Sequence, residues 1–181
     1  MPLDRPHWLQ RFATLGSCLN QPTTLCLFGR APGLLLGQPS LQIGSITAWQ
    51  PESDYAANDL AQACTASGIV FHEHNAQADT NATGCLWMVR SGPASLPDSF
   101  ETEPIGRFGK LSLTMPVPAV LCAASLGRGH ADDVDDIAWW FKVRQLDLEE
   151  VERAVDTLPS PDEIEKARSN LIYARLVAAD E

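Results

Sequence analysis

Apolar residues near the start of the chain are spaced for a helix. Positions 8, 9, 12, 15 and 19 are apolar and fall on one helical face, so the pattern predicts a helix over residues 8–19. Short apolar runs bounded by Gly, Pro, Asn and Asp follow, which is typical of strands separated by loops. The predicted strands are residues 23–28, 45–49, 69–72, 84–90 and 111–115.

Two helices are expected between these strands. Residues 31–36 form a short helix that tolerates Pro32 in its first turn. Residues 55–67 form a longer one, capped by Ser53 or Asp54 and ended by Gly68. Residues 73–83 are polar and rich in alanine, which favours an exposed hairpin tip.

After Pro116 the pattern becomes helical to the end of the chain. Helices are predicted over residues 116–126 and 132–144, and further helix starts at Asp147 and at Ser160–Pro161. The second helix has an apolar face of Val134, Ile137, Ala138 and Phe141. The third has one of Leu148, Val151, Val155 and Leu158, which either packs on the rest of the protein or mediates dimerisation. Of the adjacent Trp139 and Trp140, only one is expected to be fully buried.

This order of elements predicts an α+β protein. A mixed sheet flanked by helices, together with the N-terminal helix, occupies residues 1–115, and a C-terminal helical region, residues 116–181, packs on it. With 181 residues, 45% of them hydrophobic, the chain is long enough for one compact domain or a domain with a helical annex. No apolar run approaches the roughly 18 residues of a membrane span, and the N-terminus lacks the order of a signal peptide. We therefore expect a cytoplasmic protein without a membrane partner.

The net charge of −10 is unevenly distributed. Residues 1–131 carry nine acids and seven bases, whereas residues 132–181 carry fourteen and six. An acidic surface disfavours non-specific nucleic-acid binding unless a local basic cleft exists. Such a cleft would have to use Arg30, Arg90, Arg107, Lys110 or Arg128. The five cysteines include no CxxC pair and are expected to be reduced and buried.

Glycines follow the first predicted strand closely. Gly29 precedes the predicted short helix, Gly33 lies within it and Gly37 follows it, and the next strand carries Ser45 and Thr47 on one face. Farther along, the helical part contains in order Pro116, Ser125-Leu126, Arg128, Asp133 and Asp136.

In that order these motifs resemble the nucleotidyltransferase superfamily, which includes polymerase beta and, more similar to this chain, the AbiEii-type toxins and their small bacterial relatives. The resemblance implies a nucleotidyltransferase-like fold and a setting such as a toxin–antitoxin or phage-defence system. In the family the second strand carries an acid-x-acid pair, a neighbouring strand carries a third acid, and the helix after the proline carries a lysine.

The family's carboxylates hold divalent ions that bridge a triphosphate and an attacking hydroxyl. Here Ser45 and Thr47 occupy the acid positions, residues 85–89 contain no acid, and Ser125 occupies the lysine position. Hydroxyls are neutral and at most weak metal ligands. We therefore expect a degenerate, non-catalytic relative with no metal or cofactor of its own.

Such a relative is expected to bind a nucleotide, a phosphate or a protein partner, or to form a homodimer. A glycine turn between a buried strand and a helix can bind an anion, which makes Gly29, Arg30, Gly33, Ser45 and Thr47 the candidate ligand-binding residues. The alternative for the glycines is a structural one, ending the strand and allowing close packing. A structural role is also expected for Arg128, Asp133 and Asp136, with Asp136 paired to Arg128 or to Arg107.

Two other functional readings stay open. An active Mg²⁺-dependent transferase would need acids from elsewhere, such as Glu52, Asp54, Glu101 or Glu103. A purely structural interaction module would use the acidic helical tail.

Two histidine-containing motifs carry weaker metal hypotheses. His72-Glu73-His74 places two imidazoles on one strand face, but an exposed strand end is favoured because no third ligand follows. For His130-Ala131-Asp132-Asp133, helix capping by Asp132 is favoured.

Overall fold

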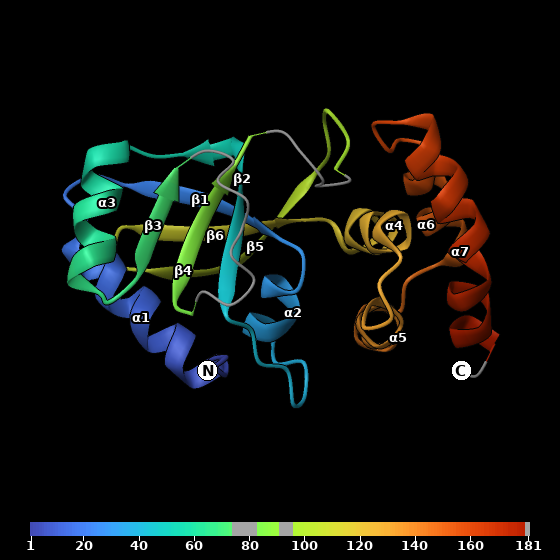
Figure 1. The fold of residues 1–181 in the computed structure, drawn as a ribbon, viewed down its shortest axis with the longest axis horizontal. Coiled ribbons are helices and arrows are strands. Elements are labelled where there is room, and N and C mark those ends of the chain that lie inside the picture. Colours follow the sequence, from blue (N-terminus) through green and yellow to red (C-terminus); the bar gives the residue numbers. More distant parts are fainter. Residues whose placement is uncertain (74–82, 91–95, 180–181) are drawn as a thin grey trace. The chain divides into compact units, whose positions relative to one another are not determined.

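The computed structural model describes residues 1–73, 83–90 and 96–179. Its contacts divide the chain into two compact units, residues 1–92 with 102–115 and residues 93–101 with 116–181. Within the described residues the first unit contains a six-stranded sheet with three helices, and the second contains four helices (Figure 1). The expected α+β class, with a mixed sheet flanked by helices, is confirmed. The predicted hairpin tip at 73–83 lies almost wholly outside the described residues.

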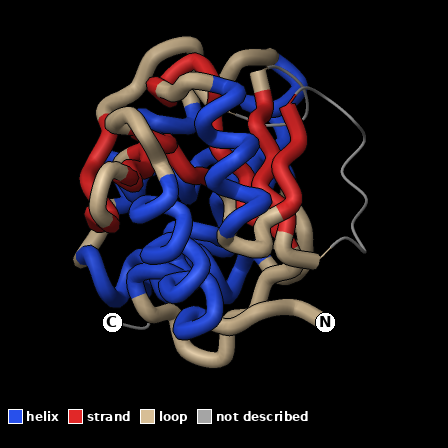
Figure 2. The backbone as a smooth tube through the Cα atoms, turned by 90° about the vertical axis from the view of Figure 1, so that its left-hand side faces the viewer, coloured by secondary structure: helices blue, strands red, loops and turns tan. Residues whose placement is uncertain are grey.

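The sheet of the first unit has the strand order β3-β4-β2-β1-β6-β5. Strands β2, β3 and β4 are parallel, β1 is antiparallel to β2, and β6 is parallel to β1. Along the chain, helices (blue in Figure 2) alternate with strands (red) as far as β3, and β4, β5 and β6 then follow without a helix between them. The elements are α1 (Arg5–Cys18), β1 (Thr23–Phe28), α2 (Ala31–Leu36), β2 (Ser45–Asp54), α3 (Ala57–Ala66), β3 (Val70–Glu73), β4 (Cys85–Val89), β5 (Thr102–Phe108) and β6 (Leu111–Pro116).

One face of this sheet forms the hydrophobic core with the three helices. Successive strand residues point to opposite faces, and the core takes alternate positions of each central strand. The sheet contributes Leu25, Leu27, Ile46, Ala48, Leu86, Met88, Leu111 and Leu113. The helices contribute Trp8, Phe12, Leu15, Leu34, Leu35, Leu60, Ala63 and Cys64. The opposite face of the same strands is therefore left for other side chains.

Helix α1 approaches the β5–β6 turn closely. The backbone N–H of Lys110 donates to the carbonyl of Gly16 at 3.2 Å, and the Lys110 carbonyl accepts from Thr23 at 2.9 Å. A Cβ at Gly16 would lie 1.7 Å from the carbonyl oxygen of Phe108. Gly109, at φ 58°, supplies the left-handed residue that the two-residue turn needs.

Strand β5 is absent from the sequence prediction. It lies at the edge of the sheet and contains Pro104 and Gly106, and its residues alternate between exposed and half-buried. Proline and glycine both weaken a strand pattern, and an edge position tolerates them because one side of the strand needs no ladder partner. The strand is therefore held by its hairpin with β6 more than by its own composition.

Strand β2 runs five residues beyond its predicted end, through an irregular pairing with β1. Cys26 pairs with Trp49, whereas Thr24 pairs with Asp54. The Ser53 hydroxyl spans the irregularity, accepting from the Cys26 N–H at 3.0 Å and donating to the Trp49 carbonyl at 2.7 Å. The predicted cap of α3 by Ser53 or Asp54 is therefore wrong: both belong to β2, and the helix is preceded by Ala56 without a side-chain cap.

The four helices of the second unit follow the predicted starts within two residues. They are α4 (Pro118–Arg128), α5 (Asp133–Arg144), α6 (Leu148–Val155) and α7 (Pro161–Ala179). Asp147 caps α6 by accepting from Glu149, and Ser160 accepts from the Glu163 N–H at 3.2 Å. The apolar face of α6 contains Val151, Val155 and Leu158, all buried. These three side chains pack inside the protein, so they do not form an exposed surface for dimerisation.

Helix α5 buries only part of the predicted face, Ile137 and Phe141, together with residues that were not predicted. The buried residues are Asp133, Asp136, Ile137, Trp140 and Phe141, whereas Val134 and Ala138 are only half-buried. The apolar pattern did not predict the whole buried face because two of the residues buried there, Asp133 and Asp136, are carboxylates. Trp140 is buried and Trp139 is not, as expected for adjacent helical residues.

Four of the five cysteines are buried, and the expectation of burial fails only at Cys18, which is exposed at the end of α1. Burial raises the pKa of the Cys64 thiol to about 12 and also raises that of Cys122. Within the described part of the chain, no helix has both the length and the apolarity to cross a membrane.

The α1 contact gives a first prediction. Gly16→Ala should lower the free energy of unfolding by about 1–3 kcal/mol, because the new Cβ overlaps a backbone carbonyl that can move only with the hairpin. Gly106→Ala is the matched control, since its Cβ would make an ordinary contact at 3.6 Å with the Phe108 ring. Urea unfolding of both variants measures the difference. Equal stability of the two would show that α1 does not constrain the hairpin.

Candidate functional site

The sheet face opposite the core carries a row of four side chains across adjacent strands. His72 of β3 is the register partner of Trp87 in β4, Trp87 of Thr47 in β2, and Thr47 of Phe28 in β1. Register partners point to the same face of a sheet. We call this surface the aromatic face; it comprises Phe28, Ser45, Thr47, Trp49, His72, Cys85 and Trp87.

Ring contacts organise the aromatic face into two pairs. His72 stacks on Trp87, with ring centroids 3.8 Å apart and an interplanar angle of 10°. Phe28 meets Trp49 edge to face at 5.9 Å. Thr47 lies between the two pairs, because its register partners are Trp87 on one side and Phe28 on the other. The Thr47 hydroxyl on the aromatic face therefore has an aromatic residue on each neighbouring strand.

Trp87 holds a buried donor without an acceptor. Its side chain is 6% exposed, and its indole Nε1 has no hydrogen-bond partner. An unsatisfied buried N–H costs about 1–3 kcal/mol, so it requires a water molecule or a ligand to explain it. Phe28, Ser45, Thr47 and His72 on the same face are half-buried.

The two residues that the resemblance aligns with an acid pair, Ser45 and Thr47, lie on this face. Ser45 and Thr47 lie two residues apart on β2 and point the same way, and their partners on β4 are Cys85 and Trp87. No member of the aromatic face is a carboxylate. Neutral hydroxyls do not hold two divalent ions close together as bridging carboxylates do.

The Gly29 turn directly adjoins the aromatic face. Gly29 follows Phe28 at φ 67°, a left-handed conformation that favours glycine, and Arg30 precedes the first residue of α2. Helix α2 has only six residues, and its first five are buried. The side of Gly33 that a Cβ would occupy meets the Gln38 amide oxygen at 2.3 Å. Of the predicted ligand-binding residues, Ser45 and Thr47 lie on β2, where Thr47 pairs with Phe28, the residue before Gly29, and Gly33 packs against Gln38.

Polar groups gather where β2 and β3 end. The Tyr55 hydroxyl donates to the Glu73 carboxylate at 3.0 Å. Burial, reinforced by Glu73, raises the pKa of Tyr55 to about 12.

On the aromatic side of β1, burial also raises the pKa of Cys26 to about 12, which keeps that thiol protonated and unreactive.

The family-motif residues of the helical part lie together in the second unit. Arg128 forms a bidentate ion pair with Asp133, whose buried carboxylate also accepts from the His130 N–H at 2.8 Å. The sequence predicts instead that Asp136, about one helical turn further along, pairs with Arg128 or with Arg107. Both carboxylates are buried, at 3% and 5% exposure, and Arg128 binds Asp133.

A cavity of about 280 Å³ adjoins this ion pair. Ser125, His130, Asp133 and Asn170 are among the residues that line it. The Asn170 amide donates to the Leu126 carbonyl at 2.8 Å, and Lys166 donates to the Arg128 carbonyl. Side chains of α7 thereby satisfy the last turn of α4.

The weaker metal hypotheses find little support in these contacts. His72 is stacked on Trp87, His74 lies outside the described residues, and His130 contributes its backbone N–H to Asp133. Asp132 precedes α5 but makes no capping hydrogen bond through its side chain. Among the described residues, no three His, Cys, Asp or Glu side chains come together as metal ligands do. The alternative acids Glu52, Asp54 and Glu101 are exposed, and Glu103 is half-buried.

Sequence reasoning missed the aromatic half of the site. Phe28, Trp49 and Trp87 were assigned to buried strands without regard to which face each occupies. The alternation Cys26–Phe28, Thr47–Trp49 and Cys85–Trp87 contained the signal, because side chains two apart share a face.

No protein-family model, curated protein or solved structure matches the chain.

The Arg128–Asp133 pair gives a second prediction. Asp133→Ala should destabilise the helical unit by about 2–3 kcal/mol, because it leaves Arg128 and the His130 N–H without their acceptor. In the double variant Arg128→Ala/Asp133→Ala, the loss should be smaller than the sum of the single losses. Thermal unfolding of the three variants measures the coupling.

The exposed pair Arg153–Glu149, with its atoms 4.0 Å apart, is the control. Alanine substitutions there should change stability by no more than about 0.5 kcal/mol. If the Arg128–Asp133 cycle is additive, the pair makes no contribution beyond its separate residues.

Proposed function

We propose that this protein is a degenerate relative of the nucleotidyltransferases that binds a nucleotide on its aromatic face and does not transfer it. The observation that carries the proposal is the unpartnered Nε1–H of Trp87 beside the hydroxyls of Ser45 and Thr47. The resemblance of the sequence motifs adds the suggested setting, a toxin–antitoxin or phage-defence system.

A nucleotide matches the chemistry of this face in both of its parts. Its base has a flat apolar surface for aromatic rings such as Phe28, and it carries carbonyl and ring-nitrogen acceptors for an indole N–H. Its phosphate needs hydrogen-bond donors and a cation, which Ser45, Thr47 and Arg30 supply from neighbouring positions. Because none of these groups is a carboxylate, binding does not require a divalent ion to screen the phosphate.

A nucleotide panel tests binding. With a ligand at 100 times its Kd, the free energy of unfolding should rise by about 2.7 kcal/mol, equally with Mg²⁺ and with EDTA. Trp87→Phe keeps an aromatic ring but removes the N–H, so it should weaken binding about tenfold. Calorimetric titration of both proteins measures the ratio.

Three outcomes contradict the proposal. No shift with any nucleotide favours a structural interaction module, and unchanged affinity in Trp87→Phe removes the indole from the site. Mg²⁺-dependent transfer of labelled nucleotide to RNA or protein would favour the active-enzyme alternative.

Trp139→Phe is the control variant for Trp87→Phe. It alters a half-buried indole in the helical unit and should leave the affinity for the nucleotide unchanged.

Restoring the missing acids tests the resemblance itself. Ser45→Asp/Thr47→Asp places two carboxylates on one face of β2 beside the Gly29 turn, and it should create a Mn²⁺ site with a stoichiometry of at least one ion. Electron paramagnetic resonance of free Mn²⁺ measures the binding. The control Ser112→Asp/Thr114→Asp places the same pair on β6, on the same face but away from the turn. Equal binding by both variants would mean that the β2 position has no special geometry.

A further inference from the structure

Basic side chains are scarce around the aromatic face. The first unit contains six arginines and lysines, and among them Arg30 belongs to the turn that adjoins this face. The six residues are Arg5, Arg11, Arg30, Arg90, Arg107 and Lys110. The positions of the other five decide how much negative charge a ligand on the aromatic face can carry.

Two of these cations lie on the core side of the sheet. Arg5 donates through Nε to the Leu35 carbonyl at 2.8 Å. The Arg11 guanidinium lies 5.7 Å from the centre of the Trp8 ring, and its Nη1 atom is buried. Leu35 and Trp8 both belong to the hydrophobic core between the sheet and its helices. Both cations are therefore on the opposite side of the sheet from the aromatic face.

The remaining three cations lie at the margins of the sheet. Arg107 belongs to edge strand β5 and donates to a carbonyl of the β5–β6 turn at 3.2 Å. Lys110 lies in that turn and donates to the Asn20 carbonyl, before the start of β1, at 2.7 Å. Arg90 follows β4 and acts on the Tyr55 hydroxyl, beyond the C-terminal end of β2. Of the six cations of this unit, Arg30 is left to meet a ligand on the aromatic face.

The spacing along β2 fits one phosphate next to a bound base. A base that accepts from the Trp87 indole lies level with Thr47, and Ser45 is the next residue on the same face, about 6.6 Å along the strand. A phosphate joined directly to the sugar of that base reaches Ser45. Because β1 is antiparallel to β2, the chain that leaves Phe28 towards Arg30 continues towards the same end of β2.

Further phosphates add charge that the other five basic side chains are not placed to compensate. A phosphate monoester carries a charge of about −1.5 to −2 at pH 7, and each added phosphate contributes about one more negative charge. Enzymes that bind triphosphates compensate this charge with Mg²⁺, which the carboxylate-free aromatic face does not hold. The chain has a net charge of −10, and Glu52 acts on the Cys26 thiol on the aromatic side of β1. Additional negative charge is therefore repelled.

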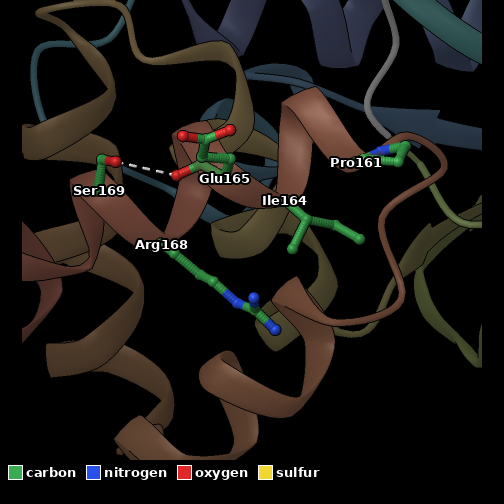
Figure 3. A pocket seen from close by; sticks show the side chains of 5 residues that line it. All are labelled: Pro161, Ile164, Glu165, Arg168 and Ser169. Atoms are coloured by element: carbon green, nitrogen blue, oxygen red, sulfur yellow. Dashed lines mark hydrogen bonds between the residues drawn. The ribbon is translucent and has the colours of Figure 1, made fainter.

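A surface hollow on α7 also contains an arginine, but its charge is already compensated. The hollow is lined by Pro161, Ile164, Glu165, Arg168 and Ser169 (Figure 3). Arg168 pairs with the Asp156 carboxylate at 2.9 Å, and Glu165 places a second carboxylate beside the hollow. The Ser169 hydroxyl donates to the Glu165 carbonyl at 2.9 Å. This hollow therefore does not match a phosphate.

The geometry points to a nucleoside monophosphate as the ligand of the aromatic face. This inference rests on the proposed nucleotide site and adds its selectivity for the number of phosphates. One phosphate is bound by Ser45, Thr47 and Arg30. A nucleoside lacks the group that these residues bind, and a triphosphate carries charge that they do not compensate. The affinity is therefore highest with one phosphate.

Calorimetric titrations in EDTA at pH 8 and low salt test this selectivity. The probes are adenosine, AMP, ADP and ATP, and the matching uridine series. The monophosphate should bind about tenfold more tightly than its nucleoside, because hydrogen bonds to a charged group are strong. The triphosphate should bind about three- to fivefold more weakly than the monophosphate. Raising the salt concentration to about 1 M should narrow this second difference, because ions screen the repulsion.

The outcomes separate this inference from the proposed function. A triphosphate that binds in EDTA as tightly as its monophosphate would overturn the selectivity and leave nucleotide binding intact. A nucleoside that binds as tightly as its monophosphate would show that the face has no phosphate site. No binding by any member of either series would contradict the proposed function, and the inference with it.

Two variants test the residues assigned to the phosphate. Arg30→Gln should bind nucleoside and monophosphate with equal affinity, at the value of the nucleoside in the native chain. Ser45→Ala alters a half-buried hydroxyl outside the Gly29 turn and should weaken monophosphate binding about tenfold without changing nucleoside binding. Unchanged preference for the monophosphate in both variants would overturn the assignment.

Arg168→Gln is the matched control for Arg30→Gln. It removes the same charge from the α7 hollow and should leave the affinities for nucleoside and monophosphate as they are in the native chain. Loss of monophosphate binding in Arg168→Gln, with retention in Arg30→Gln, would place the phosphate at α7 and overturn the inference.

Discussion

Each strand of the six-stranded sheet must divide its side chains between two faces, and this constraint determines both the core and the candidate site. Once Leu25, Leu27, Ile46 and Ala48 are committed to the helices, Cys26, Phe28, Ser45 and Thr47 are placed on the other face. The aromatic face is thus inseparable from the core: a slip of one residue in the β1–β2 register would exchange the two sets. Ser53, which bridges the irregular part of that pairing, helps to hold the register.

The sequence predicted those elements whose local signals agree with their surroundings. β1 and α2 have the predicted bounds because a β-branched apolar run, a left-handed glycine and a proline in a first helical turn all indicate the same structure. β5 escaped prediction because its pairing with β6, more than its own composition, makes it a strand. The buried face of α5 was misjudged because Arg128, outside the helix, neutralises Asp133. In both cases the structure depends on contacts with residues outside the element, which the element's own sequence pattern does not show.

Much the same division applies to the candidate site. Ser45, Thr47 and the Gly29 turn were predicted as site residues from a local motif, and the register pairs Thr47 with Phe28, next to Gly29. The partnership of His72 with Trp87 depends on the pairing of β3 with β4, which local periodicity does not specify. The site therefore combines a motif readable along one segment with aromatic groups from two others. Its character, hydroxyls among rings, differs from the carboxylate-rich surface that the resembling family uses for metal ions.

The closure of α4 by α7 has a consequence for synthesis of the chain. The carbonyls of Leu126 and Arg128 are satisfied by Asn170 and Lys166, which the ribosome adds about forty residues later. The sheet, in contrast, has all six strands once residue 116 has been added. Because domains form as their residues emerge, the first unit can fold while the second is still being made. The last turn of α4 lacks these two partners until Lys166 and Asn170 have been added, so a chain truncated before α7 should keep a folded sheet and lose the hydrogen bonds that satisfy the end of α4.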